Sequence, residues 1–512
     1  MNVKSARRAF GLAASAAGPT GMIMPTMASV ATLERIMLGR RGPRSAGRWR
    51  WAVHCCLCLL TTAGLIVALV PGDAVAGAQS AAPGPTPSSI ALNYTIRFYP
   101  RFFTYAQMSL GQSNRLSGPD GMGPAYGAVP APNNDTIYAN FFLNLDQGPE
   151  IFTIPSTQVT YSLLTVDVFG SAFQTNIQKQ APGTYGLVPL GWHGTLPAGV
   201  TEVPVPYTAT AWMIRADKYK SGLNMADQAN AFRDSLRLAS LPAYEKDPSS
   251  GATTVVPLRT YYPRAKAIAD QAVESHTMAF FRMLQVALRS PATAPLSASD
   301  RWLSRAFDRV FAAANEAARH GNKGPLSVLI QAARTAHALI IDRYVSHAGQ
   351  NRWVYFDDIA AWGTDYLDRS ATTEFLQFSN TAATSGYYTA FTDGTGVPLS
   401  GSGSRAYRLT FSKDQIPQAK RFWSLTAYIP TGMTLVPNPA TKYLVASYTP
   451  GLRRNRDGSI TIDIQPTPPA PRLMPNWLPV PRGRFCLVLR VYGPEGNTSP
   501  GSKYVPPRIL TR

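Results

Sequence analysis

Acidic residues, cysteines and histidines are all scarce in this chain. Its 512 residues include 29 Asp and Glu against 49 Lys and Arg, with four cysteines and six histidines. Cys55, Cys56 and Cys58 lie within one apolar run near the amino terminus. Cys486 is the single cysteine after this run, so it has no partner there for an intramolecular disulfide. The histidines do not show the spacing of metal ligands. The sequence therefore predicts a body without disulfides or metal, in which Cys486 is a small buried hydrophobic residue.

Motifs of common enzymes and cofactor sites are missing as well. No G-x-S-x-G sequence marks a serine hydrolase, and the glycine-rich residues 394–404 lack the lysine of a phosphate-binding loop. We therefore expect no cofactor. The net charge of +20 is spread along the chain without a compact strip of basic and aromatic residues. This distribution argues against a nucleic-acid partner.

The amino-terminal part of the chain is typical of a targeting segment. Residues 1–50 form a basic leader, with nine Lys and Arg against a single acidic residue. Residues 51–70 carry no Asp, Glu, Lys or Arg, and small residues follow them. Residues 51–78 are thus either a signal peptide cleaved near Ala76–Ala78, which gives a secreted protein, or a segment whose apolar residues 51–70 anchor it in the cytoplasmic membrane. Both interpretations place the rest of the chain outside the cytoplasm.

The remaining residues divide by hydrophobic pattern. Residues 79–90 are rich in Pro and Ser, which predicts a linker. Short β-branched and aromatic segments between turns predict β-sandwich domains at 91–220 and 385–512. Helical periodicity predicts a helical bridge at 221–384. The predicted fold class is mainly β with a helical insert (α+β), in which three or four helices bridge two antiparallel jelly-roll-like β-sandwiches.

Three segments of the bridge are the expected helices. Residues 264–289 and 299–319 are rich in helix formers, and residues 325–344 follow a Gly-Pro start signal. His337 lies on the apolar face of the last segment. We interpret it as a hydrogen-bonded core histidine.

Two stretches resemble known families. Asn133, Asp135, Thr136 and Tyr138 match the Asn-x-Asp-Thr-x-Tyr motif of the domain of unknown function numbered 1254. The segments RFWSLTAYIP, NRDGSITIDIQ and NWLPVPRGRFCLVLRVYGPE, within residues 421–495, are similar to the companion domain numbered 1214. The resemblance implies a β-sandwich fold and an extracytoplasmic setting, and implies no particular activity.

The loop before the strand at 136–145 holds the first candidate site residues. Asn133, Asn134, Asp135 and Tyr138 form a polar cluster there, and all four are candidate ligand-binding residues. Asp135 is also a candidate general base or acceptor for a sugar hydroxyl, and Tyr138 a candidate hydroxyl donor and stacking face. The alternative is structural, because Asn and Asp side chains cap their own loop backbone in Asx-turns.

Asn476 and Trp477 are the second pair of candidate ligand-binding residues. The tryptophan either closes the end of a sandwich or lines a groove where it stacks on sugar rings. Asp167 lies inside an apolar strand segment, where it would need a polar partner. Asp457-Gly458 predicts a hairpin turn.

Two functions fit these observations. The first is an extracytoplasmic binding or interaction module that recognises a carbohydrate, polymer or glycoconjugate of the cell envelope. The second is a metal-independent hydrolase or lyase outside the cytoplasm that acts on carbohydrate or ester substrates. The expected partners are the envelope ligand and, if residues 51–70 stay uncleaved, the membrane. Self-association into a homo-oligomer is compatible with both functions.

Overall fold

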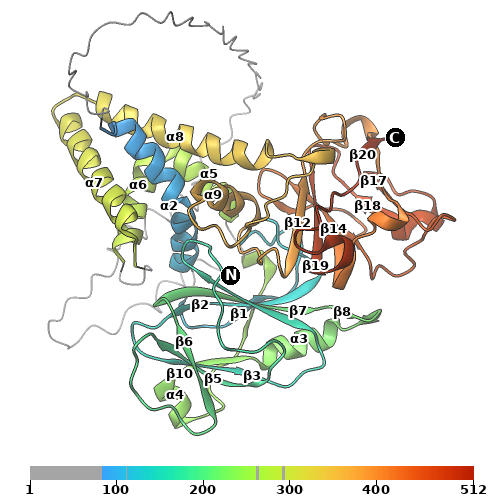
Figure 1. Cartoon of the computed structure of the whole chain (residues 1–512), viewed down its shortest axis with the longest axis horizontal. Coiled ribbons are helices and arrows are strands. Elements are labelled where there is room, and N and C mark those ends of the chain that lie inside the picture. The colour runs from blue at the N-terminus through green and yellow to red at the C-terminus, as the bar shows by residue number, and fades with distance from the viewer. Residues whose placement is uncertain (1–83, 111, 261–263, 291–294) are drawn as a thin grey trace, which may run out of the picture.

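The structure is a computed structural model that describes residues 84–110, 112–260, 264–290 and 295–512. The leader 1–50, the signal peptide or anchor at 51–78 with its cleavage site near Ala76–Ala78, and residues 79–83 of the expected linker lie outside these ranges. The described chain combines sheets and helices, which confirms a mixed α+β fold. Figure 1 shows the helices above the first β region, with the carboxy-terminal β region beside both.

The first β region contains two sheets, with strand orders β11-β1-β2-β7-β4 and β10-β3-β5-β6. The strands of the first sheet are β1 (Ser117–Pro119), β2 (Thr136–Asn144), β4 (Tyr161–Asp167), β7 (Ala209–Asp217) and β11 (Thr254–Val256). Those of the second are β3 (Glu150–Ile154), β5 (Gly183–Pro189), β6 (Val200–Val205) and β10 (Arg237–Ser240). A short hairpin, β8 (Tyr219–Lys220) and β9 (Leu223–Asn224), and the helices α3 (Ala226–Ser235) and α4 (Leu241–Lys246) complete the region.

Alternate residues of β2 and β7 fill the core between these two sheets. Phe141 on β2 stacks on Trp212 on β7 with ring centroids 5.4 Å apart, and both rings contact Phe152 on β3. Successive residues of a strand point to opposite faces of its sheet. The residues between these core positions therefore face away from the second sheet.

The carboxy-terminal β region repeats this arrangement of two sheets around one core. One sheet has the order β12-β19-β14-β15 with β16 also paired to β14, and the other has the order β18-β17-β13-β20. Their strands are β12 (Ser385–Ala390), β13 (Tyr407–Phe411), β14 (Ala419–Ile429), β15 (Thr434–Leu435), β16 (Leu444–Ala446), β17 (Ile460–Gln465), β18 (Trp477–Pro479), β19 (Cys486–Pro494) and β20 (Ile509–Thr511). Cys486 is fully buried on β19, as predicted.

The prediction of wholly antiparallel sandwiches is wrong, and the strand orders do not confirm a jelly roll. The pairs β1–β11, β5–β6 and β17–β18 are parallel. A parallel pair needs a connection that returns to the same end of the sheet. Between β1 and β11 that connection is most of the first β region, which a reading of local strand patterns does not reveal.

The helical layer is built around one long helix, α2 (Pro87–Leu110). It contacts the helices α5 (Ala265–Ser275), α6 (Thr277–Arg289), α7 (Ala298–Arg319), α8 (Gly324–Val345) and α9 (Tyr366–Leu376). Tyr94 of α2 stacks on Phe307 of α7 with ring centroids 3.8 Å apart, and Phe102 lies 4.9 Å from Phe280 of α6. The residues expected to end the linker and begin the first sheet thus form the central helix instead.

Two of the three expected helices are present with nearly the expected bounds. Ser297 caps α7 by accepting a hydrogen bond from the backbone N–H of Asp300 at 3.1 Å. Pro325 lies in the first turn of α8, where a missing N–H costs no hydrogen bond. The segment 264–289 differs, because it is divided at His276 into α5 and α6.

The helix α8 is also long and apolar enough to cross a membrane, judged by length and composition alone. In the structure it packs against α2, α7 and α9 and contributes Leu329, Ala333 and Ile340 to the core. We therefore describe α8 as a core helix.

Candidate functional site

A pocket of about 500 Å³ lies between the first β region and the helical layer. Its lining residues come from α2, α5, β1, β2, β7 and β11 and from the chain just after α9. Most of them are apolar, including Phe102, Phe103, Met213, Ile268 and Phe378. The volume lies within the roughly 300–1,000 Å³ range of small-molecule sites, which are mostly apolar with a few placed polar groups.

The floor of the pocket follows from the register of β2 and β7. Four cross-strand pairs line it, namely Tyr138 with Arg215, Asn140 with Met213, Phe141 with Trp212 and Phe142 with Ala211. Phe141 and Trp212 also belong to the sandwich core, whereas the other three pairs alternate with the core positions, so the opposite face of these strands forms most of the floor.

The roof of the pocket is formed by α2 and α5. Phe102, Phe103 and Ala106 on α2 and Ala265 and Ala269 on α5 line this side of the apolar space. Their spacing of three and four residues places them on one side of each helix.

A side-chain amide pair fixes one side of this roof. Gln107 Nε2 donates to Gln377 Oε1 at 2.8 Å and to the backbone oxygen of Ala128 at 2.8 Å. This pair ties α2 to the segment that follows α9.

Arg215 brings a buried positive charge to the pocket. Its Nη2 donates to Phe378 O at 2.8 Å and its Nη1 to Asn380 Oδ1 at 3.3 Å, while its guanidinium carbon lies 5.3 Å from the centre of the Tyr138 ring. Among the described residues, its Nε has no hydrogen-bond partner. Within the described part of the chain, no carboxylate forms an ion pair with Arg215, and none of the described lining residues is acidic.

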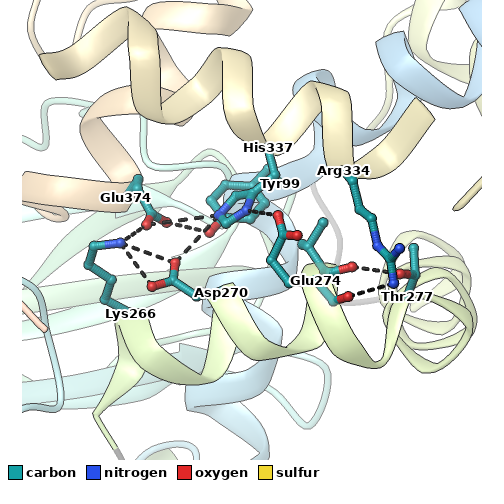
Figure 2. Close-up of polar contacts among 9 residues, drawn as sticks. Tyr99, Lys266, Asp270, Glu274, Thr277, Arg334, His337 and Glu374 are labelled. Carbon is teal, nitrogen blue, oxygen red and sulfur yellow. Dashed lines mark hydrogen bonds and ion pairs between the residues drawn. The ribbon is translucent and has the colours of Figure 1, made fainter. Parts of the chain in front are cut away.

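A second polar group, the helix cluster, joins four helices beside the pocket (Figure 2). It consists of Tyr99 on α2, Lys266 and Asp270 on α5, His337 on α8 and Glu374 on α9. Lys266 Nζ lies 3.0 Å from Asp270 Oδ2 and also contacts Glu374, which accepts a hydrogen bond from Tyr99. None of these five side chains lines the pocket, although Ala265 and Ala269 of the same α5 do.

Burial and hydrogen bonding give the two carboxyl groups of the helix cluster different charges. Burial raises the pKa of Glu374 to about 8, so this group is protonated at neutral pH. Burial acts in the same direction on Asp270, but hydrogen bonds from His337, Glu374 and Lys266 outweigh it and hold its pKa at about 2. The ion pair at neutral pH is therefore Lys266 with Asp270.

Asp270, His337 and Glu374 together have the donor atoms of a cation site, all within 4.8 Å of one another. Lys266 Nζ lies against both carboxyl groups, so the positive charge there is supplied by the lysine. His337 is buried and its Nδ1 lies 2.8 Å from Glu274 Oε1, in keeping with the interpretation as a hydrogen-bonded core histidine.

The motif residues Asn133 and Asp135 lie between the first β region and the carboxy-terminal sheet. Both are buried. The Nδ2 of Asn133 donates to the hydroxyl oxygen of Tyr492, and the carboxylate of Asp135 accepts hydrogen bonds from Ser424 and Tyr448. The Oδ1 of Asn133 also accepts the N–H groups of Asp135 and Thr136, both at 3.2 Å, which is the predicted Asx-turn.

The other motif residues have different surroundings. Asn134 is half-buried and donates to the backbone oxygen of Met122. Tyr138 alone among the predicted residues lines the pocket, and its hydroxyl oxygen accepts the N–H of Asn133 at 3.4 Å.

Asn476 ends a short 3-10 helix in the carboxy-terminal β region, and Trp477 is the first residue of β18. Asn476 donates to the backbone oxygens of Arg453 and Thr461, at 2.9 and 2.8 Å, and Trp477 Nε1 donates to the backbone oxygen of Gln465 at 2.8 Å. Both side chains are buried. The candidate residues therefore do not share one pocket.

The two remaining sequence predictions concern turns. Asp167 Oδ1 accepts the backbone N–H groups of Phe169 and Ser171 at 2.8 and 2.9 Å, which supplies the polar partner that its position needs. Asp457 likewise accepts the N–H of Ser459 at 3.0 Å within a turn.

Arg215 is the site residue that the sequence did not identify. It ends the apolar segment TATAWMIR, and a lone arginine in an otherwise apolar strand is a signal of the same kind as Asp167. Its neighbours Phe378 and Asn380 lie more than 160 positions later, and no local pattern brings them to β7.

Comparisons with known proteins agree with the resemblance inferred from the sequence. Residues 113–240 match the family described as protein of unknown function DUF1254, and residues 384–496 match that described as protein of unknown function DUF1214. No curated protein matches this chain.

Two solved structures are similar to the chain. The VPA0106 protein from Vibrio parahaemolyticus is 18% identical, with coverage of 83% of this chain and 100% of that one and a TM-score of 0.52. An uncharacterized protein from Burkholderia cenocepacia is 14% identical, with coverage of 83% and 92% and a TM-score of 0.40. The first likeness shows a shared fold. Residues 113–240 and 384–496 are thus similar to these two families, in the order in which the sequence resemblance places them.

Proposed function

We propose that this protein is an extracytoplasmic binding protein and that the pocket between β2, β7, α2 and α5 holds an amphiphilic small molecule of the cell envelope. The observation that carries the proposal is the pocket itself, which combines a volume of about 500 Å³, a mostly apolar lining and a few polar side chains at defined positions. Burial of an apolar chain there would contribute roughly 25 cal/mol per Å² of surface removed from water.

The apolar lining favours the acyl part of an envelope glycoconjugate over a free sugar. Every hydroxyl of a buried sugar needs a hydrogen-bond partner, whereas the roof of the pocket presents Phe102, Phe103 and Ile268. The proposal therefore narrows the ligand to an envelope amphiphile whose apolar chain occupies the pocket.

The placement of Asp135 supports binding over the alternative of a hydrolase or lyase. Its carboxylate is occupied by Ser424 and Tyr448 between the two β regions, and Tyr138 reaches the pocket without it. General acid–base catalysis needs both groups within hydrogen-bond reach of one substrate.

The extracytoplasmic setting is supported by the leader. The basic residues of 1–50 and the uncharged residues 51–70 are typical of a segment that directs a chain to or across a membrane. A binding protein secreted or anchored there would meet envelope amphiphiles directly.

Blocking the pocket tests the proposal. Dodecanol is titrated against the purified full-length chain, held in an amphipathic polymer so that no detergent competes, with displacement of the uncharged fluorescent probe phenylnaphthylamine as the readout. We expect wild type to bind dodecanol and Ala269→Phe to lose most of this binding, because its ring would occupy the space between α5 and β2.

Ala267→Phe is the matched control, since Ala267 is exposed on the same helix. Equal binding by wild type and both variants, with unchanged melting temperatures, would show that the pocket is not the site. No binding by wild type would remove the proposed function.

A further inference from the structure

We propose that the ligand of the pocket carries an anionic head group, a carboxylate, and that Arg215 binds it at the buried end of the pocket. The inference rests on the proposed function and adds the chemical class and the orientation of the ligand. It is carried by Arg215, the lining around it and the backbone that holds it.

Arg215 has hydrogen-bonding capacity that the protein does not use. A guanidinium offers five N–H donors in a planar fork. In the structure one bond goes to Phe378 O and one to Asn380 Oδ1, the Tyr138 hydroxyl group also interacts with the guanidinium, and Nε has no partner among the described residues. The residue is 7% exposed, so solvent replaces little of what is missing.

The charge of Arg215 is also left without a counter-ion. Buried charges in proteins are usually paired, because a charge removed from water loses several kcal/mol of solvation. The buried Arg233 has Asp234 as an ion-pair partner at 2.8 Å, whereas no described carboxylate pairs with Arg215. A carboxylate on the ligand would complete this site, and Arg binds that group through two parallel hydrogen bonds.

Other groups at this end of the pocket suit a head group. The Tyr138 ring packs against the guanidinium and limits its movement. The Oδ1 of Asn140, one pair further along the floor, is buried and has no hydrogen-bond partner. An amide oxygen only accepts hydrogen bonds, so within this carboxamide it is the Nδ2 that is the donor suited to the proposed anion.

The backbone that supports Arg215 is unusual at Phe378. This residue has a φ of +57°, a left-handed conformation that costs about 1–2 kcal/mol in a residue with a side chain. The carbonyl group of Phe378 accepts the hydrogen bond from Arg215, and Phe378 itself lines the pocket. Strained residues that persist in this way are concentrated at binding and catalytic sites.

The lining also sets the orientation of the ligand. Gln112 and Arg115 are exposed and Thr254 is half-buried, so the pocket opens at β1 and β11. Arg115 already has partners there in Gln112 and Thr254. The anionic head is therefore placed at Arg215 and the apolar chain toward the opening.

Three ligands of equal chain length test the inference on the full-length chain by probe displacement. They are dodecanoate, dodecanol and dodecyl phosphate. We expect wild type to bind dodecanoate roughly ten- to a hundred-fold more tightly than dodecanol, from the usual strength of a hydrogen bond to a charged group. A single arginine neutralises one negative charge, so dodecyl phosphate is expected to bind less tightly than dodecanoate.

Arg215→Met should remove the preference for dodecanoate and leave dodecanol binding in place. Arg215→Lys keeps the positive charge but lacks the paired N–H donors of the guanidinium, so it should retain part of the preference. It replaces Arg215→Met in the test if that variant does not fold. Arg454→Met, at an exposed arginine outside the pocket, is the control and should behave as wild type.

Each other outcome overturns the inference. Equal affinity of wild type for dodecanoate and dodecanol shows that no anion is recognised, while the proposed function stands. A preference lost in Arg115→Met and kept in Arg215→Met places the head group at the opening. Tighter binding of dodecyl phosphate than of dodecanoate assigns a different anion.

Discussion

The carboxylate of Asp135 accepts a hydrogen bond of 2.8 Å from the hydroxyl group of Ser424, a residue 289 positions later in the chain. Asp135 lies in the part of the chain that matches DUF1254 and Ser424 in the part that matches DUF1214. Tyr448 donates to the other oxygen of the same carboxylate. The side chain of Asp135 thus joins the two matched parts of the chain.

This contact predicts coupling between Asp135 and Tyr448. Asp135→Asn and Tyr448→Phe should each lower the free energy of unfolding by about 1–3 kcal/mol, because each leaves a buried polar group without its partner. The double variant should cost less than the sum, with a coupling energy of about 0.5–3 kcal/mol. Chemical denaturation followed by tryptophan fluorescence measures all four proteins. Additive effects would contradict the contact, and Asp146→Asn, at an exposed aspartate, is the control.

Glu374→Gln should change how stability depends on pH. The pKa of Glu374 is raised from 4.5 to about 8, so between these values the folded state binds a proton that the unfolded state has released. Stability from this group is fully present below pH 4.5 and is lost as the pH rises toward 8, with a slope of at most about 1.4 kcal/mol per pH unit. Glutamine resembles the protonated acid, so the variant should have a flatter profile. A profile parallel to that of wild type would refute this assignment, and Glu202→Gln is the exposed control.

His337→Gln should affect the upper part of the same pH range. Burial acts to lower the pKa of His337, but its contact with Asp270 at 3.4 Å and its hydrogen bond with Glu274 at 2.8 Å outweigh it, so the pKa is raised above 6.5. The stability that the protonated imidazole contributes is fully present below pH 6.5 and is lost as the pH rises through the raised pKa. Unfolding free energies from pH 5 to 9 should show a smaller loss above about pH 6.5 in the variant. His193→Gln, at an exposed histidine, should follow wild type.

Trp477→Phe separates a structural role from a binding role. The variant loses the hydrogen bond from Nε1 to Gln465 and part of the buried ring. We expect the free energy of unfolding to fall by about 1–3 kcal/mol, with dodecanol and dodecanoate binding unchanged. Trp302→Phe, at a tryptophan 51% exposed, provides the comparison for stability. Weaker ligand binding at unchanged stability would restore Trp477 as a site residue.

Periodicity was a good guide where one face of an element is buried and the other is wet or lines a pocket. The bounds of α7 and α8 were predicted nearly as they are. The helix α2 was missed because Tyr94, Phe98 and Phe102 favour a strand by local preference and Pro100 interrupts the helical pattern. Five helices surround α2, and tertiary packing overrides its local preference.

The candidate site was less accessible to sequence reasoning than the fold. The sequence predicted a binding role for polar loop residues such as Asn133 and Asp135. In the structure their side chains form hydrogen bonds with residues of the carboxy-terminal β region. The pocket needs β2, β7, α2 and α5 together, and the partners of Arg215 come from beyond α9. A site assembled from segments so far apart has no local pattern.

The backbone oxygen of Ala131 accepts a hydrogen bond from Arg490, which is synthesised 359 residues later. At about 5–20 residues per second, a ribosome needs roughly 20–70 s to cover that distance. Throughout this interval the Ala131 oxygen lacks its donor and Asn133 lacks the hydroxyl group of Tyr492, while Asp135 gains Ser424 and Tyr448 only toward the end. The loop that holds Ala131 therefore lacks part of its hydrogen bonding until β19 has been synthesised. A chain that stops before β19 should expose this loop to proteases and chaperones.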